Sequence, residues 1–487
     1  MSDFKRIIPN FGIGILAFLI ILSPACRQGR QDDIPITTTS KEARKDFIQA
    51  RDLSEFFHLD KASDFLSQAL VKDTDFALAH LYSAMTSTRT RDFLFHLRHA
   101  EALASDISRG EQLLIRSFLA FYMDNDPVKS MGLFEELVQA HPGDKRAHWY
   151  LSRAYTHRGK TEKAIDSLEN TLDLDKRFAP AWQDLGYLYT ETGEYKRAES
   201  AFMKYMRLKP REPKGHDGIA DLYTRAGRFE EAVTQYEQAL EMDPDFLTSK
   251  RKLGTVLIFM NKFEEGREAV RQAMEREQDA GRRVYDQEHI FRSYLYERDY
   301  TNALEAVDRT IQMAFDQGLP GEAARCNLAK AAVCCELKAY ENAIHCMSDC
   351  LEVIVSTDLV PSQKEAIAND VLFWQAAISA NCRDFENAYK RADELKAKLE
   401  TGKDPSRLKY HTALLGHIAM RQEDFGSACE FYAHAKINEP LFLYQEAVAK
   451  AKAGNKGEAN TLYRKVINWN SDSLWYALVR PKAIARN

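Results

Sequence analysis

A period of 34 residues is the feature of this sequence that most constrains its fold. Four consecutive units keep this spacing without an insertion, which chance does not produce. Three columns of similar residues mark the period: Tyr155, Tyr189, Tyr223 and Leu257; Gly159, Gly193, Gly227 and Asn261; and Ala164, Ala198, Ala232 and Gly266. A fixed period of this length predicts one structural unit stacked on copies of itself.

Apolar residues within a unit recur every three or four positions, as they do in amphipathic helices. In one unit they are Trp182, Leu185 and Tyr189, followed by Ala198 and Phe202. We therefore predict two helices per unit, joined at the Gly and Asn column, because these residues tolerate the left-handed backbone at a helix C-terminus. The small residues of the third column let the two helices approach closely. One such pair cannot bury both of its faces, so the units must stack into a solenoid.

The best-preserved unit, residues 179–212, contains Trp182, Leu185-Gly186, Tyr189, Ala198, Phe202 and Pro210 at this spacing. The pattern resembles the tetratricopeptide repeat (TPR) family, and residues 145–178 and 213–246 match it less fully. The resemblance implies an all-α fold, a right-handed α-solenoid of about 12 helix-turn-helix units. A low content of helix breakers agrees with this, since Gly and Pro make up 36 of 487 residues, about 7% against roughly 12% in an average protein.

The repeats divide the chain into segments. Residues 43–280 hold units at the 34-residue period, and residues 281–473 hold longer, divergent units in which the columns resume at a spacing near 40. Residues 474–487 begin apolar and turn basic. We expect them to form a capping segment with Trp469 and Trp475 packed under it, because the last unit of a solenoid needs a cover. A docking peptide is the alternative for this segment.

The amino terminus differs from the rest of the chain. Lys5 and Arg6 precede an apolar run over residues 11–22, followed by Ser23, Ala25 and Cys26. This pattern predicts a signal peptide over residues 1–25, and it resembles a bacterial lipoprotein signal, which implies lipidation at Cys26. An ordinary cleaved signal and an uncleaved membrane anchor are the alternatives. Residues 26–42 are polar and are predicted to be a tether.

This amino terminus predicts a place in the cell envelope. The protein would be exported and membrane-anchored like a lipoprotein, or periplasmic or secreted. The membrane would then be a partner through the N-terminus. Nucleic acid is not expected as a partner, because 67 Lys and Arg against 72 Asp and Glu leave a net charge of −5 and no long basic run is present.

Catalytic motifs are missing from the sequence. It has no phosphate-binding loop of the GxxxxGK type, no GxSxG nucleophile elbow and no HExxH helix. We therefore expect a protein that is not an enzyme, with no catalytic residues, no cofactor and no metal site.

Seven cysteines lie in the second half of the chain: Cys326, Cys334, Cys335, Cys346, Cys350, Cys382 and Cys429. Cys346 and Cys350 are four residues apart and share a helix face. The main interpretation is that these side chains fill small positions where helices cross. A disulfide formed after export, or a metal or reactive-thiol site between Cys326 and Cys350, remain as alternatives.

In TPR proteins the first helices of the pairs line a concave groove that binds peptides, and the resemblance implies the same surface here. By the register of the family, the central groove positions are Arg146, Trp149, Arg153 and His157; Gln183, Tyr187 and Glu191; and Asp217, Asp221 and Arg225. Trp149, Arg153 and Tyr187 are the strongest candidates, because aromatic and Arg side chains dominate interface energies.

The sequence thus favours a non-catalytic scaffold or adaptor for protein interactions, tethered in the bacterial cell envelope, that binds a protein or peptide partner in its groove. One alternative is a membrane-anchored regulatory sensor with an uncleaved N-terminal helix. Another is a metal or thiol protein that uses the cysteine cluster.

Overall fold

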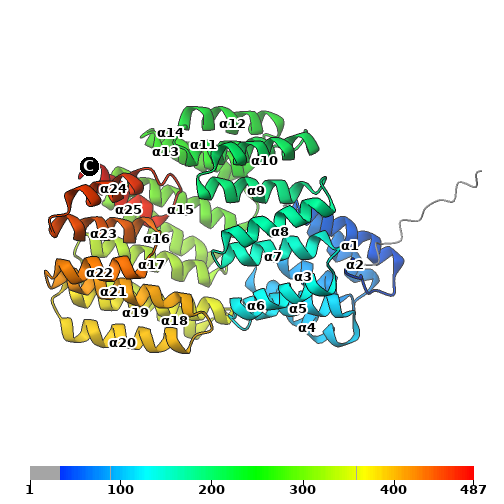
Figure 1. Ribbon diagram of the computed structural model, residues 1–487, viewed down its shortest axis with the longest axis horizontal. Helices are drawn as coiled ribbons and strands as arrows, with labels where there is room; N and C mark the ends of the chain where they lie inside the picture. Colours follow the sequence, from blue (N-terminus) through cyan, green and yellow to red (C-terminus); the bar gives the residue numbers. More distant parts are fainter. Residues whose placement is uncertain (1–32, 57, 88, 358) are drawn as a thin grey trace, which may run out of the picture.

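A computed structural model describes residues 33–487 apart from residues 57, 88 and 358. These residues form 25 α-helices, two short 3-10 helices and no strand. Helices α1 to α24 make twelve consecutive antiparallel pairs, and α25 follows the last pair (Figure 1). The predicted all-α solenoid of about twelve helix pairs is therefore confirmed.

The first seven pairs follow the 34-residue frame closely. Their bounds are α1 (Lys41–Ser54) with α2 (Leu59–Lys72), α3 (Ala77–Thr86) with α4 (Thr90–Ala102), α5 (Arg109–Tyr122) with α6 (Pro127–Ala140), α7 (Lys145–His157) with α8 (Thr161–Leu174), α9 (Ala179–Thr192) with α10 (Tyr195–Leu208), α11 (Lys214–Arg225) with α12 (Phe229–Met242), and α13 (Leu247–Phe259) with α14 (Phe263–Arg276).

The remaining five pairs are mostly longer. They are α15 (Ala280–Glu297) with α16 (Tyr300–Asp316), α17 (Pro320–Glu336) with α18 (Tyr340–Ser356), α19 (Pro361–Asn381) with α20 (Phe385–Thr401), α21 (Leu408–Arg421) with α22 (Phe425–Ala435), and α23 (Pro440–Lys452) with α24 (Lys456–Ile467). The chain ends in α25 (Leu474–Ile484), and the 3-10 helices are η1 (Ala104–Asp106) and η2 (Pro405–Arg407).

The repeat columns have the structural roles that their residue types suggest. Ala164, Ala198 and Ala232 are fully buried where the two helices of a pair cross. Gly159, Gly193 and Gly227 have positive φ, and so does Asn261, the fourth member of that column. The left-handed turn between the helices is therefore the same in all four units.

Helices α13 and α14 approach more closely than a side chain allows. A Cβ atom on Gly254 would lie 2.6 Å from the carbonyl oxygen of Gly266, and a Cβ on Gly266 would lie 2.6 Å from the carbonyl oxygen of Gly254. This mutual contact explains why Gly266 replaces the alanine of the third column.

We expect Gly254→Ala to destabilise the protein by about 1–3 kcal/mol, since overpacking forces backbone shifts. The control is Gly132→Ala in α6, where a Cβ meets nothing within 4 Å and where alanine should stabilise the helix by roughly 0.5–1 kcal/mol. Urea denaturation of both variants measures the two effects. Equal stability of the two variants would show that the helices separate freely.

The described part of the predicted tether lies on the solenoid. The backbone N–H of Ile34 donates to Asp144 at 2.7 Å, and the backbone N–H of Thr37 donates to Glu111 at 2.7 Å. Ile34 and Ile36 also pack against the core of the first units. Residues 33–40 are therefore docked on the first units, because Ile34 and Ile36 bury apolar surface there. Residues 1–32, with the predicted signal and Cys26, lie outside the described residues.

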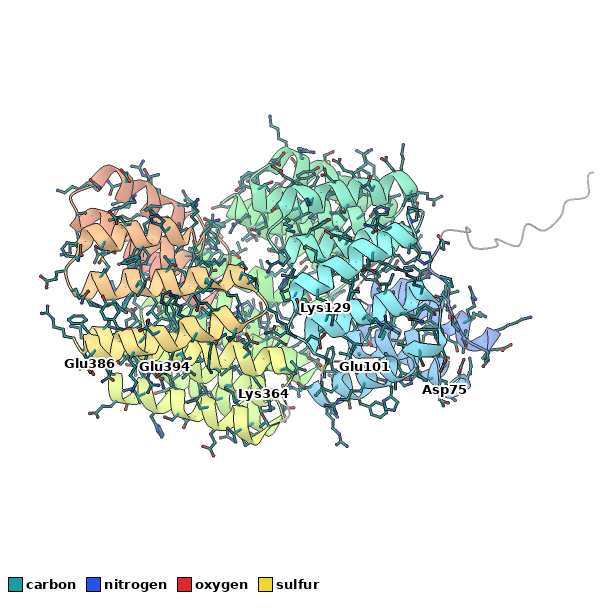
Figure 2. The ribbon with its side chains drawn as sticks, turned by 60° about the horizontal axis from the view of Figure 1, so that its bottom comes forward. Asp75, Glu101, Lys129, Lys364, Glu386 and Glu394 are labelled. Carbon is teal, nitrogen blue, oxygen red and sulfur yellow. The ribbon has the colours of Figure 1, made fainter. Side chains whose placement is uncertain are left out.

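The solenoid curves until its first half meets its second half. Arg158 pairs with Asp404 at 2.5 Å, and the side chain of Asn125 donates to Glu365 at 2.5 Å. In Figure 1 the chain runs from α1 on the right, over α12 at the top, to α20 at the lower left, and α6 faces α18 and α19. Figure 2 shows the same border from another side, with Lys129 of the first half and Lys364 of the second half beside it.

The C-terminal segment closes the second half from inside. Helix α25 contacts α15 as well as α23 and α24. The carboxylate of Asp472 pairs with Arg292 at 2.9 Å and His289 at 3.1 Å, and it accepts the hydroxyl of Tyr296 at 3.0 Å. The expected cap thus also reaches units far earlier in the chain. Trp475 does not pack under its own helix but stacks on Trp374 of α19, with ring centroids 5.1 Å apart.

Candidate functional site

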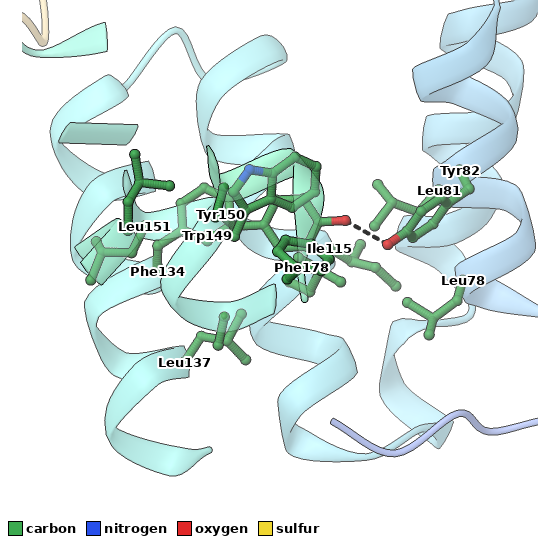
Figure 3. Packing of buried hydrophobic residues seen from close by; sticks show 14 of the residues in the cluster. Leu78, Leu81, Tyr82, Ile115, Phe134, Leu137, Trp149, Tyr150, Leu151 and Phe178 are labelled. Carbon is green, nitrogen blue, oxygen red and sulfur yellow. Dashed lines mark hydrogen bonds between the residues drawn. The ribbon is translucent and has the colours of Figure 1, made fainter. Parts of the chain in front are cut away.

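Two of the predicted groove residues belong to the core. Trp149 is only 4% exposed, and its indole N–H donates to Asp184 at 2.7 Å. Figure 3 shows Trp149 among buried side chains, beside the pair formed by the hydroxyls of Tyr82 and Tyr150. Gln183 is buried as well. Trp149, expected as an accessible anchor for a partner, is instead a packing residue, because the next unit covers its face of α7.

Arg146 is held by the first unit. Its guanidinium pairs with Glu55 at 2.5 Å and with Asp52 at 3.2 Å. Glu55 is itself buried. Arg146 therefore joins α7 to the loop after α1 and is already neutralised where a partner would have to meet it.

Asp217 and Asp221 form the centre of a polar network on the inner face. Lys252 pairs with Asp221 at 2.6 Å and with Asp217 at 3.0 Å, and Asp221 also accepts the hydroxyl of Tyr187 at 3.0 Å. Asp217 is fully buried and pairs with Lys214 at 2.9 Å. Burial raises the pKa of Asp217, but Lys214 and Lys252 outweigh it and hold that pKa well below its usual range. These predicted groove residues join neighbouring units to one another.

Arg225 is engaged by the C-terminal segment. Its guanidinium donates to the backbone carbonyl of Trp469, lies 4.6 Å from the centroid of that indole ring, and pairs with Glu191 at 3.4 Å. Glu191 is exposed. The groove position of Arg225 is thus filled by the chain itself.

Arg153 and His157 are the predicted residues that border an open space. Both are exposed residues of α7, and they line a hollow of about 460 Å³ between α3 and α7. We call this space the aromatic hollow; its ring-bearing residues other than His157 are Phe93, Phe118, Phe121, Tyr122, Phe134 and Tyr150. The guanidinium of Arg153 lies 5.3 Å from the ring of Trp149, and His157 contacts Phe121 edge to face at 4.6 Å.

The aromatic hollow was not foreseen in the sequence. Most of its rings come from α4, α5 and α6, in units whose repeat columns are weak. An unusual density of aromatic residues over 118–122 was the available signal. Aromatic rings beside a cation make the hollow suited to an apolar or aromatic side chain of a partner.

A second space lies at the centre of the molecule. This central cavity has a volume of about 640 Å³ and is enclosed by α15, α17, α19, α20, α21, α23 and the start of α25. His157 lines both the central cavity and the aromatic hollow, so the two spaces adjoin at α7.

Asp370 is an exposed residue of α19 that lines the central cavity. Desolvation raises its pKa to about 6, opposed by Arg407 and assisted by Glu439. Its pKa in the folded protein therefore exceeds its value of about 3.9 in an unfolded chain. The contribution of Asp370 to stability is then full below pH 4 and is lost as the pH rises through 6.

We expect Asp370→Asn to unfold at the same temperature as the unaltered protein at pH 4 and at a higher temperature at pH 7.5. Thermal unfolding followed by circular dichroism across this range is the measurement. A difference between the two proteins that stays constant with pH would contradict the assignment.

The seven cysteines of the second half are free thiols. Cys326 donates to Glu288 at 3.2 Å, and Cys350 donates to the backbone carbonyl of Cys346 at 3.1 Å. A hydrogen bond with the thiol of Cys346 lowers the pKa of Cys334 to about 7. Within residues 33–487, the three masked positions aside, no three His, Cys, Asp or Glu side chains are grouped as metal ligands. Cys326, Cys334, Cys346 and Cys350 are buried between helices, in agreement with the packing interpretation, whereas Cys335 and Cys429 are partly buried and Cys382 is exposed.

None of the helices formed by the described part of the chain combines the length and the apolar character needed to cross a membrane.

Several solved structures are similar to parts of this chain at low sequence identity. A TPR protein from Parabacteroides merdae is 14% identical, covers 56% of this chain and 94% of its own, and has a TM-score of 0.37. MamA is 19% identical over 35% of this chain and 96% of its own, with a TM-score of 0.29. YrrB, a TPR protein with an unusual peptide-binding site, is 18% identical over 38% of this chain and 94% of its own, with a TM-score of 0.26.

Family comparisons locate the repeats in the sequence. No curated protein matches the chain. Models described as tetratricopeptide repeat match residues 132–177 and 179–212, and one described as TPR repeat matches residues 220–257. These matches fall on α6 to α13, where the repeat columns are strongest. The chain therefore contains tetratricopeptide repeats within residues 132–257, and helix pairs continue on either side of them.

Proposed function

We propose that this protein is a non-catalytic scaffold that binds a segment of a partner protein in its aromatic hollow. The observation that carries the proposal is the contrast along the inner face. Ion pairs within the chain engage Arg146 and Asp217, and Arg225 donates to the backbone carbonyl of Trp469. In contrast, Arg153 and His157 border a space with aromatic walls. Rings and an arginine around one hollow are the groups that dominate interface energies.

The partner segment would place an apolar or aromatic side chain against Phe121 and Tyr122 and a carboxylate near Arg153. Such a ligand buries its ring against preformed walls, and this limits the entropy that the protein loses on binding. A fold of this kind does not by itself assign a function, so the proposal rests on the residues that line the hollow.

Affinity capture with the full chain as bait tests this proposal. The variant Phe121→Ala with Arg153→Glu removes one ring and reverses the charge at the hollow. The control, Tyr195→Ala with Arg207→Glu on α10, likewise removes one ring and reverses one charge, at exposed positions outside the hollow. We expect the hollow variant to lose partners that the control retains. Capture of the same proteins by both variants would end the proposal.

The place of action that we propose is the bacterial cell envelope, with the scaffold tethered through a lipidated Cys26. The sequence around Cys26 supports this, and so does the docking of residues 33–40 on the first units, which would hold the solenoid close to its anchor. Labelling with radioactive palmitate and membrane fractionation, each with Cys26→Ala as control, test it. A label and a membrane fraction that do not depend on Cys26 would contradict it.

A further inference from the structure

Two histidine side chains face each other between the helices of the second pair. His80 of α3 and His96 of α4 have their Nδ1 atoms 3.0 Å apart. His80 is 6% exposed, and His96 is half-buried. A third ring, that of His99, stacks on His80 with the ring centroids 5.1 Å apart. Two imidazole nitrogens that converge on one point form a donor set that several transition-metal ions accept.

The contacts of His80 fix which of its ring nitrogens carries a proton. Its Nε2 lies 3.0 Å from the backbone carbonyl oxygen of Thr74. Because a carbonyl oxygen only accepts, the Nε2–H of His80 is the donor, and Nδ1 of the neutral ring is unprotonated. The Nδ1–H of His96 then donates to it. A histidine that binds a metal usually donates its other N–H to a carbonyl or carboxylate in this way, which orients the ring. His80 is therefore already held as a metal ligand would be.

The electrostatic surroundings suit a cation beside these rings. Burial lowers the pKa of both His80 and His96, so both imidazoles are neutral at pH 7 and available as ligands. The charge of Asp75 opposes this pKa shift at His80, and the charge of Asp92 opposes it at His96. Both carboxylates are exposed. Neutral ligands near negative charge favour a bound divalent ion, because the ion displaces few protons and is attracted by the carboxylates.

The separation of the two nitrogens selects among metals. Bonds from a metal to an imidazole nitrogen are about 2.0–2.1 Å long. Two such nitrogens at a right angle, as on a square-planar ion, lie about 2.8–3.0 Å apart, whereas two tetrahedral ligands lie about 3.3–3.4 Å apart. The distance of 3.0 Å between the Nδ1 atoms matches the right angle. Square-planar and tetragonal nitrogen sites are typical of Cu²⁺ and Ni²⁺.

We propose that His80 and His96 bind one Ni²⁺ or Cu²⁺ ion through their Nδ1 atoms, with water in the remaining positions. When the ion binds, the proton on Nδ1 of His96 moves to Nε2 of the same ring, so the ring stays neutral and no proton is released. Water completes the coordination because the described part of the chain holds no group of three His, Cys, Asp or Glu ligands. The inference is independent of the proposed function, since neither histidine lines the aromatic hollow.

Calorimetric titration of the full chain with nickel chloride tests the site, with protein purified without a histidine tag. Nickel is the probe because Cu²⁺ also oxidises thiols, which this chain contains. We expect one Ni²⁺ per chain, bound more tightly than Zn²⁺. His96→Ala removes one of the two ligands and should weaken Ni²⁺ binding about tenfold or more, since the loss of even an outer-shell partner of a metal ligand costs roughly 10–100-fold in affinity.

His434→Ala is the matched control and should keep the affinity for Ni²⁺. His434 is an exposed histidine of α22 whose Nδ1 also bonds a backbone carbonyl, that of Glu430, at 2.7 Å. His80→Gln is a second variant at the site, and circular dichroism shows whether each variant is folded. The proposal would be overturned by the absence of Ni²⁺ binding, by tighter binding of Zn²⁺ than of Ni²⁺, or by Ni²⁺ binding that survives in folded His80→Gln or His96→Ala protein.

Discussion

Asp472→Ala is expected to lower the free energy of unfolding by about 3–5 kcal/mol, the usual cost of breaking a buried ion pair from one side. Asp472 lies in the loop before α25 and pairs with Arg292 and His289 of α15, more than 170 residues earlier in the chain. Arg292 and His289 are buried, so the substitution leaves a cation without its main counterion. Urea denaturation measures the loss.

Replacing Asp472 should also change how the free energy of unfolding depends on pH under acidic conditions. Burial raises the pKa of Asp472, but Arg292 and His289 outweigh this and hold it well below its usual range. A lowered pKa contributes stability that is present above the unfolded value of about 3.9 and is lost as the pH falls below it. The gap between the unaltered protein and Asp472→Ala should therefore narrow below pH 4.

A matched control separates the ion pair from the general loss of a carboxylate. Asp166→Ala on α8 removes an exposed aspartate, and surface substitutions of this kind usually stay within about 0.5 kcal/mol. Similar effects of Asp166→Ala and Asp472→Ala would show that the C-terminal segment is not held on α15.

Asp217→Ala should also destabilise the protein by about 3–5 kcal/mol. Asp217 is fully buried between Lys214 and Lys252 and accepts the hydroxyl of Ser249 at 2.9 Å. Glu191→Ala is the control, because Glu191 is another acidic groove position but is exposed, and it should cost no more than about 0.5 kcal/mol. Chemical denaturation of both variants gives the comparison. If Asp217→Ala is as stable as the unaltered protein but no longer binds a partner, Asp217 belongs to the binding groove instead.

The repeat columns predict the fold well because each column reports a local requirement of one helix pair. Ala198 and Ala232 must be small where helices cross, and Gly193 and Gly227 must adopt positive φ between them. These requirements are met within about 34 residues, so the helix bounds follow from the spacing alone.

In several later units, the residue at the turn between the two helices cannot be recognised from the sequence. Arg298, Lys338, Arg383 and Glu423 take the left-handed conformation at the turns where earlier units have glycine. Positive φ is uncommon for such residues, so their identity gives no signal. Their units remained recognisable through the aromatic and alanine positions at the start of the second helices, such as Tyr340 and Ala343.

The binding surface was harder to predict than the fold. Family register places Trp149 and Asp217 on the inner face but does not say whether that face meets a partner or the next unit. Arg225 meets Trp469, which is 244 residues away, and no local pattern encodes that contact. The aromatic hollow likewise arises from rings on several helices of the weakest units.

Helix α25 packs within the second half of the solenoid and joins helices of distant pairs. Zero-length carbodiimide cross-linking at low protein concentration tests this most directly. Lys482 of α25 pairs with Glu336 of α17, and Lys145 pairs with Asp175 in the neighbouring unit at 2.5 Å. We predict that mass spectrometry finds both links within single chains. The Lys145–Asp175 link without the Lys482–Glu336 link would show that α25 does not pack on α17 and would contradict this arrangement.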